Sequence, residues 1–323
     1  MRNILCVWPV TDAHKKQLET AAPDFTFEYI EANLLTKEQV SKAEIILGNI
    51  PAKYIPEARN LKWLQLNSAG TDEYVASGIL PDSVLLTNAT GAYGQAVSEH
   101  MFATLLMLQK KLHLYRDSQG TQSWIDYGQV SSLVGKKVLI CGLGDIGTAF
   151  AKLCKALGAY TLGIRRREGP GAPWVDEVFS SNALDNLLPE VDVVASVLPN
   201  TPDTVGIFNE KRFSAMKSTA FFINAGRGNA VDQEALYNAL VTYQGTDKGI
   251  GGASIDVTSP EPLPQDHPLW KVKNLIITPH VSGFYHLPET FERIVQIATE
   301  NLKKYENKQL LSNIVDFETG YKK

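Results

Sequence analysis

A glycine-rich turn between a strand and a helix is the feature that most constrains the fold of this chain. The segment KVLICGLGDIGTAFAKLCKALG consists of an apolar run, a G-x-G-x-x-G turn and a helical pattern. The first glycine permits a tight turn, the second lets a pyrophosphate approach the backbone, and the third lets the helix pack closely on the strand. Amides at the start of the helix face the phosphates. The turn therefore predicts a dinucleotide site that includes Gly142, Gly144, Asp145, Ile146 and Gly147.

Short apolar runs alternate with helical patterns on both sides of this turn. Such alternation is typical of parallel sheets covered by helices on both faces. We therefore predict an α/β fold with two doubly wound parallel sheets, and one long apolar helix over residues 95–116 followed by an irregular segment. The expected strands are residues 3–8, 25–30, 43–49, 61–70 and 83–91 before that helix, and 137–142, 160–164, 191–197, 219–225, 251–257 and 274–280 after it.

The order of these elements also predicts how the domains are connected. The last helical pattern, residues 288–307, leads away from the second series of strands and would return to the first. We therefore expect a dinucleotide-binding domain of residues 99–290, inserted into a substrate domain of residues 1–98 and 291–323. Ligands of such sheets bind beyond the carboxyl ends of the strands. The loops NSAGTD and TNATGAYG, which follow two strands of the first series, are therefore candidate ligand contacts.

Three arginines, Arg165, Arg166 and Arg167, follow the second strand of the expected cofactor domain. Dinucleotide sites usually place an acid about 20 residues after the glycine turn, where it binds the ribose hydroxyls. A carboxylate there would repel a 2′-phosphate, whereas an arginine can bind one through charge-assisted hydrogen bonds. We therefore predict that NADPH/NADP is preferred and that NADH/NAD remains possible. The alternative is that the arginines form only a solvated loop.

Composition disfavours several other classes of protein. The net charge of -4 shows no basic surplus of the kind that nucleic-acid binding requires. The longest apolar stretch, residues 101–108, is far too short to span a membrane, and no targeting segment is recognised. The 3 cysteines, in apolar stretches without motif spacing, are expected to be buried and reduced. We expect a cytoplasmic protein with no metal, nucleic-acid or membrane partner.

Three later loops follow expected strands and carry charged or titratable residues. INAGRGNAVDQEAL carries Arg227, SIDVTSPEPLPQDHPLW carries Asp256 and Glu261, and NLIITPHVSG carries His280. Together with LPNTPDTVGIFNEKRFSAMK, they resemble the D-isomer-specific 2-hydroxyacid dehydrogenases, above all the NADPH-dependent glyoxylate/hydroxypyruvate reductases and 2-oxoacid reductases. The resemblance covers most of the chain. It implies a Rossmann cofactor domain inserted into a flavodoxin-like substrate domain.

The resemblance also implies a role for each residue. Reduction of a 2-oxoacid needs a hydride on the carbonyl carbon, a proton on its oxygen and a grip on the carboxylate. His280 is implied as the proton donor, Glu261 as its partner, and Arg227 as the residue that binds the carboxylate and polarises the carbonyl. The further contacts implied are Leu198, Pro199, Ala225 and Asp256 for the cofactor, with Asp256 at the nicotinamide carboxamide, and Ser68, Ala69, Gly70 and Tyr93 for the substrate.

Each of these residues, taken alone, also has a structural explanation, because PH after a strand, a loop acid and a surface arginine are all common. Their joint occurrence in this order favours a catalytic site. His286 is close enough in sequence to His280 to contact a substrate. The other histidines are expected to be structural: His14, His100, His113 and His267. Several aromatic side chains could line a roomy pocket: Tyr93, Trp270, Phe284 and Tyr285.

Two further expectations concern function beyond the site. A dinucleotide-sensing interaction protein of the corepressor kind, with little turnover, is the alternative to an enzyme, and the lack of a disordered extension disfavours it. We expect a homodimer, because residues 95–116 and the following WIDYGQV carry more apolar surface than one domain needs. The segment 242–254 is longer than is usual for the resembled family and is expected to be a surface loop.

Overall fold

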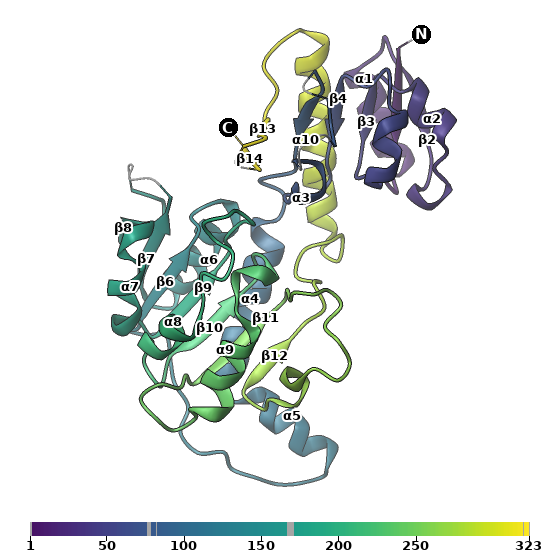
Figure 1. Cartoon of the computed structure of the whole chain (residues 1–323). Helices are drawn as coiled ribbons and strands as arrows, with labels where there is room; N and C mark the ends of the chain where they lie inside the picture. The colour runs from purple at the N-terminus through teal and green to yellow at the C-terminus, as the bar shows by residue number, and fades with distance from the viewer. Residues whose placement is uncertain (1, 76–78, 82, 167–170, 319, 323) are drawn as a thin grey trace. The chain divides into compact units, whose positions relative to one another are not determined.

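The structure, a computed structural model, describes the chain except residues 1, 76–78, 82, 167–170, 319 and 323 (Figure 1). The chain forms two compact units. Unit 1 consists of Met1–Tyr93 and Leu287–Lys323, and unit 2 consists of Gly94–His286. The boundaries expected from the sequence, 98/99 and 290/291, lie a few residues further along the chain, inside the helices that follow each observed boundary.

Unit 1 is built on a five-stranded parallel sheet with the order β2-β1-β3-β4-β5, which is the flavodoxin-like order. Its strands are short, and two of them, β3 and β4, are buried throughout. Helix α10 buries an apolar stripe that includes Ile294, Ala298 and Leu302. The sheet consists of β1 (Asn3–Cys6), β2 (Thr26–Tyr29), β3 (Ile45–Leu47), β4 (Trp63–Gln65) and β5 (Leu85–Thr87), and the other elements are α1 (Asp12–Ala21), α2 (Lys37–Lys42), α3 (Asp72–Val75), α10 (Pro288–Glu306), β13 (Val315–Asp316) and β14 (Tyr321–Lys322).

Unit 2 is built on a seven-stranded parallel sheet with the order β12-β11-β10-β9-β6-β7-β8, which is the Rossmann order with one strand added. The order reverses between β6 and β9, and ligands of such sheets bind at that point. The strands are β6 (Lys137–Cys141), β7 (Tyr160–Arg165), β8 (Glu177–Ser180), β9 (Val193–Ser196), β10 (Phe221–Asn224), β11 (Gly252–Ile255) and β12 (Leu275–Ile277), and the helices are α4 (Gly94–Gln109), α5 (Leu112–Gly120), α6 (Asp145–Ala156), α7 (Leu184–Leu187), α8 (Glu210–Ala215) and α9 (Gln233–Tyr237).

Two details of the predicted elements are wrong. The single helix expected over residues 95–116 is two helices, because Lys111 adopts a left-handed backbone conformation with φ 57° and ends the regular hydrogen bonding between α4 and α5. The edge strand β8 was not expected, since its four residues EVFS are only partly buried and carry no continuous apolar run. The predicted fold class, two doubly wound parallel sheets, is confirmed.

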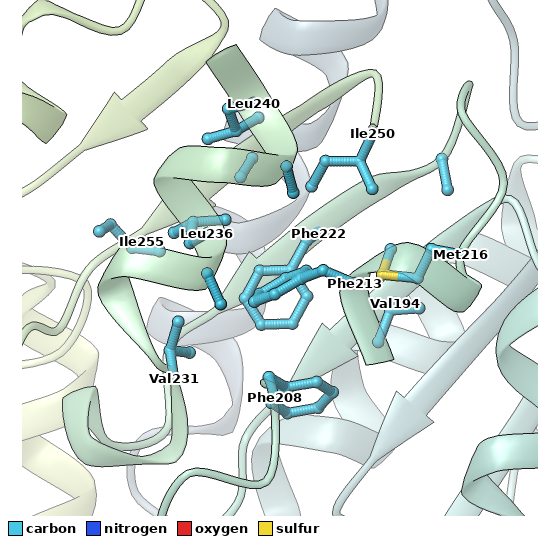
Figure 2. Close-up of a cluster of buried hydrophobic side chains, with 14 of the residues drawn as sticks. Val194, Phe208, Phe213, Met216, Phe222, Val231, Leu236, Leu240, Ile250 and Ile255 are labelled. Atoms are coloured by element: carbon cyan, nitrogen blue, oxygen red, sulfur yellow. The ribbon is translucent and has the colours of Figure 1, made fainter. Parts of the chain in front are cut away.

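The core of unit 2 lies between the sheet and helices α8 and α9 (Figure 2). Three phenylalanine rings form its centre: Phe222 on β10 lies 4.8 Å from Phe208 and 5.1 Å from Phe213, measured between ring centroids. Such edge-to-face pairs add about 0.5–1.5 kcal/mol beyond the burial of their apolar area. The core fixes the strands whose carboxyl ends carry the candidate site.

The burial of the cysteines agrees with the sequence prediction. All three cysteines are buried and unpaired. Burial raises the pKa of the Cys6 and Cys141 thiols to about 12, so both remain protonated and unreactive at neutral pH. No helix among the described residues is long and apolar enough to cross a membrane.

The glycine turn has the geometry that its sequence predicts. Gly142 has φ 104°, a conformation that favours glycine. A methyl group on Gly147 would lie 1.9 Å from the carbonyl oxygen of Gly142, so only glycine lets α6 begin this close to β6. A methyl group on Gly144 would meet no atom within 4 Å, which leaves that face of the turn open.

We predict that Gly147→Ala destabilises the fold by about 1–3 kcal/mol, because the added methyl group must displace the backbone of the turn. Gly144→Ala is the matched control, since its methyl group enters open space. Urea unfolding of both variants measures the effect. Equal free energies of unfolding for the two variants would contradict the close packing of α6 on β6.

Candidate active site

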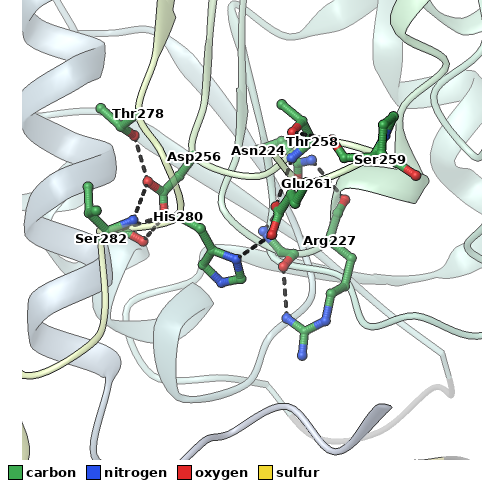
Figure 3. Close-up of polar contacts among 12 residues, drawn as sticks. Asn224, Arg227, Asp256, Thr258, Ser259, Glu261, Thr278, His280 and Ser282 are labelled. Carbon is green, nitrogen blue, oxygen red and sulfur yellow. Dashed lines mark hydrogen bonds and ion pairs between the residues drawn. The ribbon is translucent and has the colours of Figure 1, made fainter. Parts of the chain in front are cut away.

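Three adjacent loops of unit 2 carry the candidate catalytic residues. Arg227 follows β10, Glu261 follows β11 and His280 follows β12. These strands are parallel neighbours in the sheet, so their carboxyl ends lie side by side. Figure 3 shows the three side chains in one view with the polar contacts around them. The structure thus brings together the three residues that the sequence singled out.

Close packing and hydrogen bonds hold the loops after β10 and β11 together. A methyl group on Gly228 would lie 1.9 Å from the carbonyl oxygen of Thr258, so glycine next to Arg227 allows the loops to touch. The side-chain amide of Gln233, on α9, donates to the Ser259 carbonyl at 2.6 Å. Arg227 is therefore placed relative to Glu261 by backbone contact.

Asn224, the last residue of β10, fixes the backbone of Arg227 through hydrogen bonds. The Asn224 side-chain amide donates to the Arg227 carbonyl at 2.9 Å, and the Asn224 side-chain oxygen accepts from the Gly226 amide at 3.2 Å. The Arg227 guanidinium donates to the Gly226 carbonyl at 2.9 Å. Arg227 is partly buried, which suits a cation that binds an anionic ligand at the end of the sheet.

His280 and Glu261 form a direct pair. The Nδ1 atom of His280 lies 2.9 Å from Oε2 of Glu261, while Oε1 of Glu261 accepts from the Thr258 amide at 2.9 Å. An ionised carboxylate only accepts hydrogen bonds, so Nδ1 carries hydrogen and Nε2 is the ring nitrogen directed away from Glu261. The side chains are 53% and 39% exposed, so the pair is accessible to a small ligand.

Asp256 is buried beneath the segment that carries His280. Its side chain is 3% exposed, and both oxygens already accept hydrogen bonds from the chain that carries His280. Oδ1 accepts from the Thr278 hydroxyl at 2.6 Å and from the Val281 amide at 3.0 Å. Oδ2 accepts from the amide of Ser282 at 3.1 Å and from its hydroxyl at 2.5 Å (Figure 3). Four donors occupy its acceptor positions, and the expected contact of Asp256 with the nicotinamide carboxamide stays a prediction.

Sequence reasoning missed three residues of this network: His100, Thr278 and Ser282. Nε2 of His100, on α4, lies 3.0 Å from the Thr278 hydroxyl. Nothing in the sequence indicates this contact, because His100 and Thr278 are 178 positions apart and His100 lies in an ordinary helical pattern. Thr278 and Ser282 flank His280 and carry hydroxyls, which is a weak signal that could have singled them out.

The predicted cofactor contacts lie around the glycine turn. Asp145 begins α6, and its carboxylate accepts from the Gly94 amide at 2.7 Å, which ties the starts of α4 and α6 together. Next to the turn, the loops after β9 and β10 pack tightly, since a methyl group on Gly226 would lie 2.5 Å from the Leu198 carbonyl oxygen. The remaining predicted contacts in this region are partly buried: Ile146, Leu198, Pro199 and Ala225.

The arginines stand at the carboxyl end of β7, the strand next to β6. Arg165 is the last residue of β7 and partly buried, Arg166 is exposed, and Arg167 lies outside the described residues. Leu143 of the glycine turn packs over this strand, because a methyl group on Gly163 would lie 2.5 Å from its side chain. Arg165 therefore lies at the same edge of the sheet as the turn.

Three predicted substrate contacts of unit 1, Ser68, Ala69 and Gly70, lie in the loop after β4, and the fourth, Tyr93, follows β5. Two asparagines fix this loop, since the Asn49 amide donates to the Asn67 side chain at 2.7 Å and the Asn67 amide donates to the Asn49 side chain at 3.0 Å. The Ser68 hydroxyl donates to the Gly70 carbonyl at 2.6 Å. The Tyr93 hydroxyl donates to the Asn67 carbonyl. Tyr93 thus supports the loop that carries Ser68, Ala69 and Gly70.

The aromatic residues after His280 form a small exposed cluster. Phe284 is 63% exposed with φ 52°, and its ring lies 5.9 Å from that of His286 and 6.1 Å from that of Tyr285. Trp270 donates from Nε1 to the Pro264 carbonyl at 2.8 Å.

Within the described part of the chain, no three His, Cys, Asp or Glu side chains are grouped so that they could hold a metal ion.

Comparison with known proteins identifies the family of this chain. Residues 102–282 match the family model of the NAD-binding domain of D-isomer specific 2-hydroxyacid dehydrogenases. A glyoxylate reductase of Thermofilum pendens is 32% identical over 80% of this chain and 76% of its own length.

Solved structures of the same family cover nearly the whole chain. A D-isomer specific 2-hydroxyacid dehydrogenase family protein from Aeromonas salmonicida is 32% identical, with a TM-score of 0.86 over 98% of this chain and 99% of its own. One from Xanthobacter autotrophicus, solved in complex with NADPH and MES, is 27% identical, with a TM-score of 0.82 over 99% of each chain. The chain therefore belongs to the D-isomer specific 2-hydroxyacid dehydrogenase family and is an NAD(P)-dependent oxidoreductase.

Proposed function

We propose that this enzyme reduces a 2-oxoacid to the D-2-hydroxyacid with NADPH. The observation that carries the proposal is the His280–Glu261 pair, 2.9 Å apart, on loops that neighbour the Arg227 loop. A proton donor and a cation at one sheet edge are what reduction of an anionic ketone requires. The bound nicotinamide would supply the hydride.

His280 supplies the proton in this proposal. Glu261 accepts the hydrogen bond from Nδ1, so the proton that reaches the ketone oxygen comes from Nε2. The Glu261 carboxylate also stabilises the positive charge of the protonated ring, and the Thr258 amide holds Glu261 in place. In the reverse direction the same nitrogen accepts the proton from the hydroxyl group.

Arg227 would hold the substrate carboxylate. Arg227 carries a permanent positive charge at the end of β10 and polarises the ketone. The amides of Ser68, Ala69 and Gly70 donate no hydrogen bond to any residue that the structure describes, so they are suited to bind carboxylate oxygens. The 2-oxoacid is not identified further by these groups, which recognise only features that all 2-oxoacids share.

The glycine turn supports the cofactor assignment. Gly142 and Gly147 have the conformation and packing of a dinucleotide turn, and the open face of Gly144 would receive the pyrophosphate. Arg165 and Arg166 at the end of β7 would bind the 2′-phosphate of NADPH. The NADPH-bound structure of the Xanthobacter relative is consistent with this preference. A corepressor-like role without turnover is not favoured, since the chain holds a complete set of groups for the reaction.

We predict that His280→Ala lowers kcat by about 10²–10⁴-fold, because the proton transfer loses its donor. The measurement is NADPH consumption with glyoxylate, hydroxypyruvate, pyruvate and phenylpyruvate, which also identifies the preferred acid. His267→Ala is the control, since His267 lies in a turn outside the pair. Near-normal turnover of His280→Ala would contradict the proposed role of His280. If the native chain turns over no 2-oxoacid, a dinucleotide-sensing interaction protein is favoured instead.

We predict a preference for NADPH over NADH of about tenfold or more, because each charge-assisted bond to the 2′-phosphate contributes about 1.5–3 kcal/mol. Salt should weaken the preference, since Arg166 is exposed. The readout is the ratio of kcat/KM for the two cofactors, in the native chain and in Arg165→Asp. Arg59→Asp, an equal change of charge at an exposed position of unit 1, is the control. If Arg165→Asp leaves the ratio of kcat/KM for NADPH and NADH unchanged, the arginines form only a solvated loop.

We also propose a homodimer formed through the segment after α5. Residues 123–132 form neither helix nor strand, and their Tyr127 is anchored to α5 by a 2.7 Å hydrogen bond to Ser118. Apolar side chains of this region point into solvent: Leu112 is 53% exposed, Trp124 103%, Ile125 47%, Val130 52% and Val134 72%. Such a group of exposed apolar residues favours burial against a second copy.

Trp124→Glu is expected to give a monomer at micromolar concentration, because a charge in a desolvated interface costs more than the lost apolar contact. Light scattering after size-exclusion chromatography gives the mass. Leu310→Glu is the control, since Leu310 is 81% exposed but lies in unit 1. A native chain that is already monomeric would disprove the dimer.

A further inference from the structure

A chain of hydrogen bonds links helix α4 to the loop that carries His280. It begins at His100, passes through the Thr278 hydroxyl at 3.0 Å, and ends at Oδ1 of Asp256, 2.6 Å from that hydroxyl. Nε2 of His100 is itself 3.9 Å from the same carboxylate oxygen. All these residues belong to unit 2, so the chain is complete within one compact unit.

The direction of each hydrogen bond follows from the groups present. The Thr278 hydroxyl has a single hydrogen, which it donates to the Asp256 carboxylate. Its oxygen must therefore accept from His100, so Nε2 of His100 carries hydrogen in this contact. His100 is thus a donor whether its ring is neutral or charged. Each bond in such a series polarises the next, so the carboxylate and the ring are coupled through the hydroxyl.

The buried end of this chain determines the backbone at His280. Asp256 accepts from the Val281 amide and from the Ser282 amide and hydroxyl, and its own carbonyl accepts from the His280 amide at 2.7 Å. Between these contacts His280 has a backbone φ of 54°, a left-handed conformation that residues other than glycine rarely adopt. Such a conformation persists only where the surroundings impose it.

We propose that His100 is a positioning residue of the active site, acting through Thr278 and Asp256 to hold His280 in its left-handed backbone conformation. The inference rests on the proposed role of His280. Among the described residues, the polar contacts of His100 are with Thr278 and Asp256 and not with the predicted catalytic groups, so it acts on the proton donor only through the network. The alternative is that His100 merely fills space between α4 and β12 at 23% exposure.

His100→Leu tests the proposal, because leucine keeps apolar bulk but donates no hydrogen bond. We expect kcat to fall about 5–30-fold, since small displacements of a catalytic group are costly. The Kd for NADPH, measured by fluorescence titration of the free enzyme, should change less than about twofold. His100→Gln should recover most of the loss, because its amide nitrogen can donate to Thr278 from a similar distance along the side chain.

Thr278→Val provides a second route that does not depend on how well His100→Leu folds. Valine is close to threonine in shape but lacks the hydroxyl, so it breaks the chain at its middle, and Thr278→Ser keeps the hydroxyl as its matched control. The double variant His100→Leu with Thr278→Val should lose no more activity than Thr278→Val alone, because both act through one hydroxyl. Losses that multiply would overturn the proposal.

His113→Leu is the control for the loss of a helical histidine, since the ring of His113 has a hydrogen bond to the Met107 carbonyl at 3.3 Å and lies outside this network. Native kcat in His100→Leu, or failure of His100→Gln to recover a loss, would overturn the positioning role. If His280→Ala is inactive while His100→Leu and Thr278→Val are native, only the role of His100 fails, and if His280→Ala is active, the proposed function fails as well.

Discussion

The buried Asp256 carboxylate is the contact on which the geometry of the candidate site depends. It lies at the end of β11 and collects four hydrogen bonds from residues 278–282, the segment that follows β12. Burying a charge is costly unless hydrogen bonds replace its water, and here the surrounding chain supplies all of them. The result is a loop whose backbone is determined on both sides of His280, so that its imidazole meets Glu261.

Close backbone contacts fix the position of the Arg227 loop, whereas hydrogen bonds fix the position of the His280 loop. Gly228 lets the loop after β10 touch Thr258, and Gly226 lets it touch Leu198. Each contact is closer than any side chain permits. Three loops from three neighbouring strands are therefore held side by side, with His280 and Glu261 exposed, Arg227 partly buried and Asp256 buried beneath them. This arrangement explains why the polar residues of the site form two layers, one exposed and one buried.

The exposed layer was predictable from the sequence, and the buried layer was not. Arg227, Glu261 and His280 each follow an apolar run, and parallel strands bring their carboxyl ends to one edge, so strand order alone places them together. Asp256 was singled out for the same reason, but its hydrogen bonds to residues 278–282 were not predicted, because the sequence does not show that the chain folds back over it. His100 was read as an ordinary helical residue, since its partner Thr278 is distant in sequence.

The sequence by itself determined the fold class, the glycine turn and the exposed residues of the site, because these follow from local rules: an apolar period, a turn that only glycine permits, and polar residues at strand ends. Only the tertiary structure decided the break at Lys111, the edge strand β8 and the network from His100 to Asp256. The physical reason is the range of the interactions. Backbone conformation and burial pattern depend on a few neighbouring residues in the sequence. A buried hydrogen bond depends instead on which distant side chain the packing brings within about 3 Å.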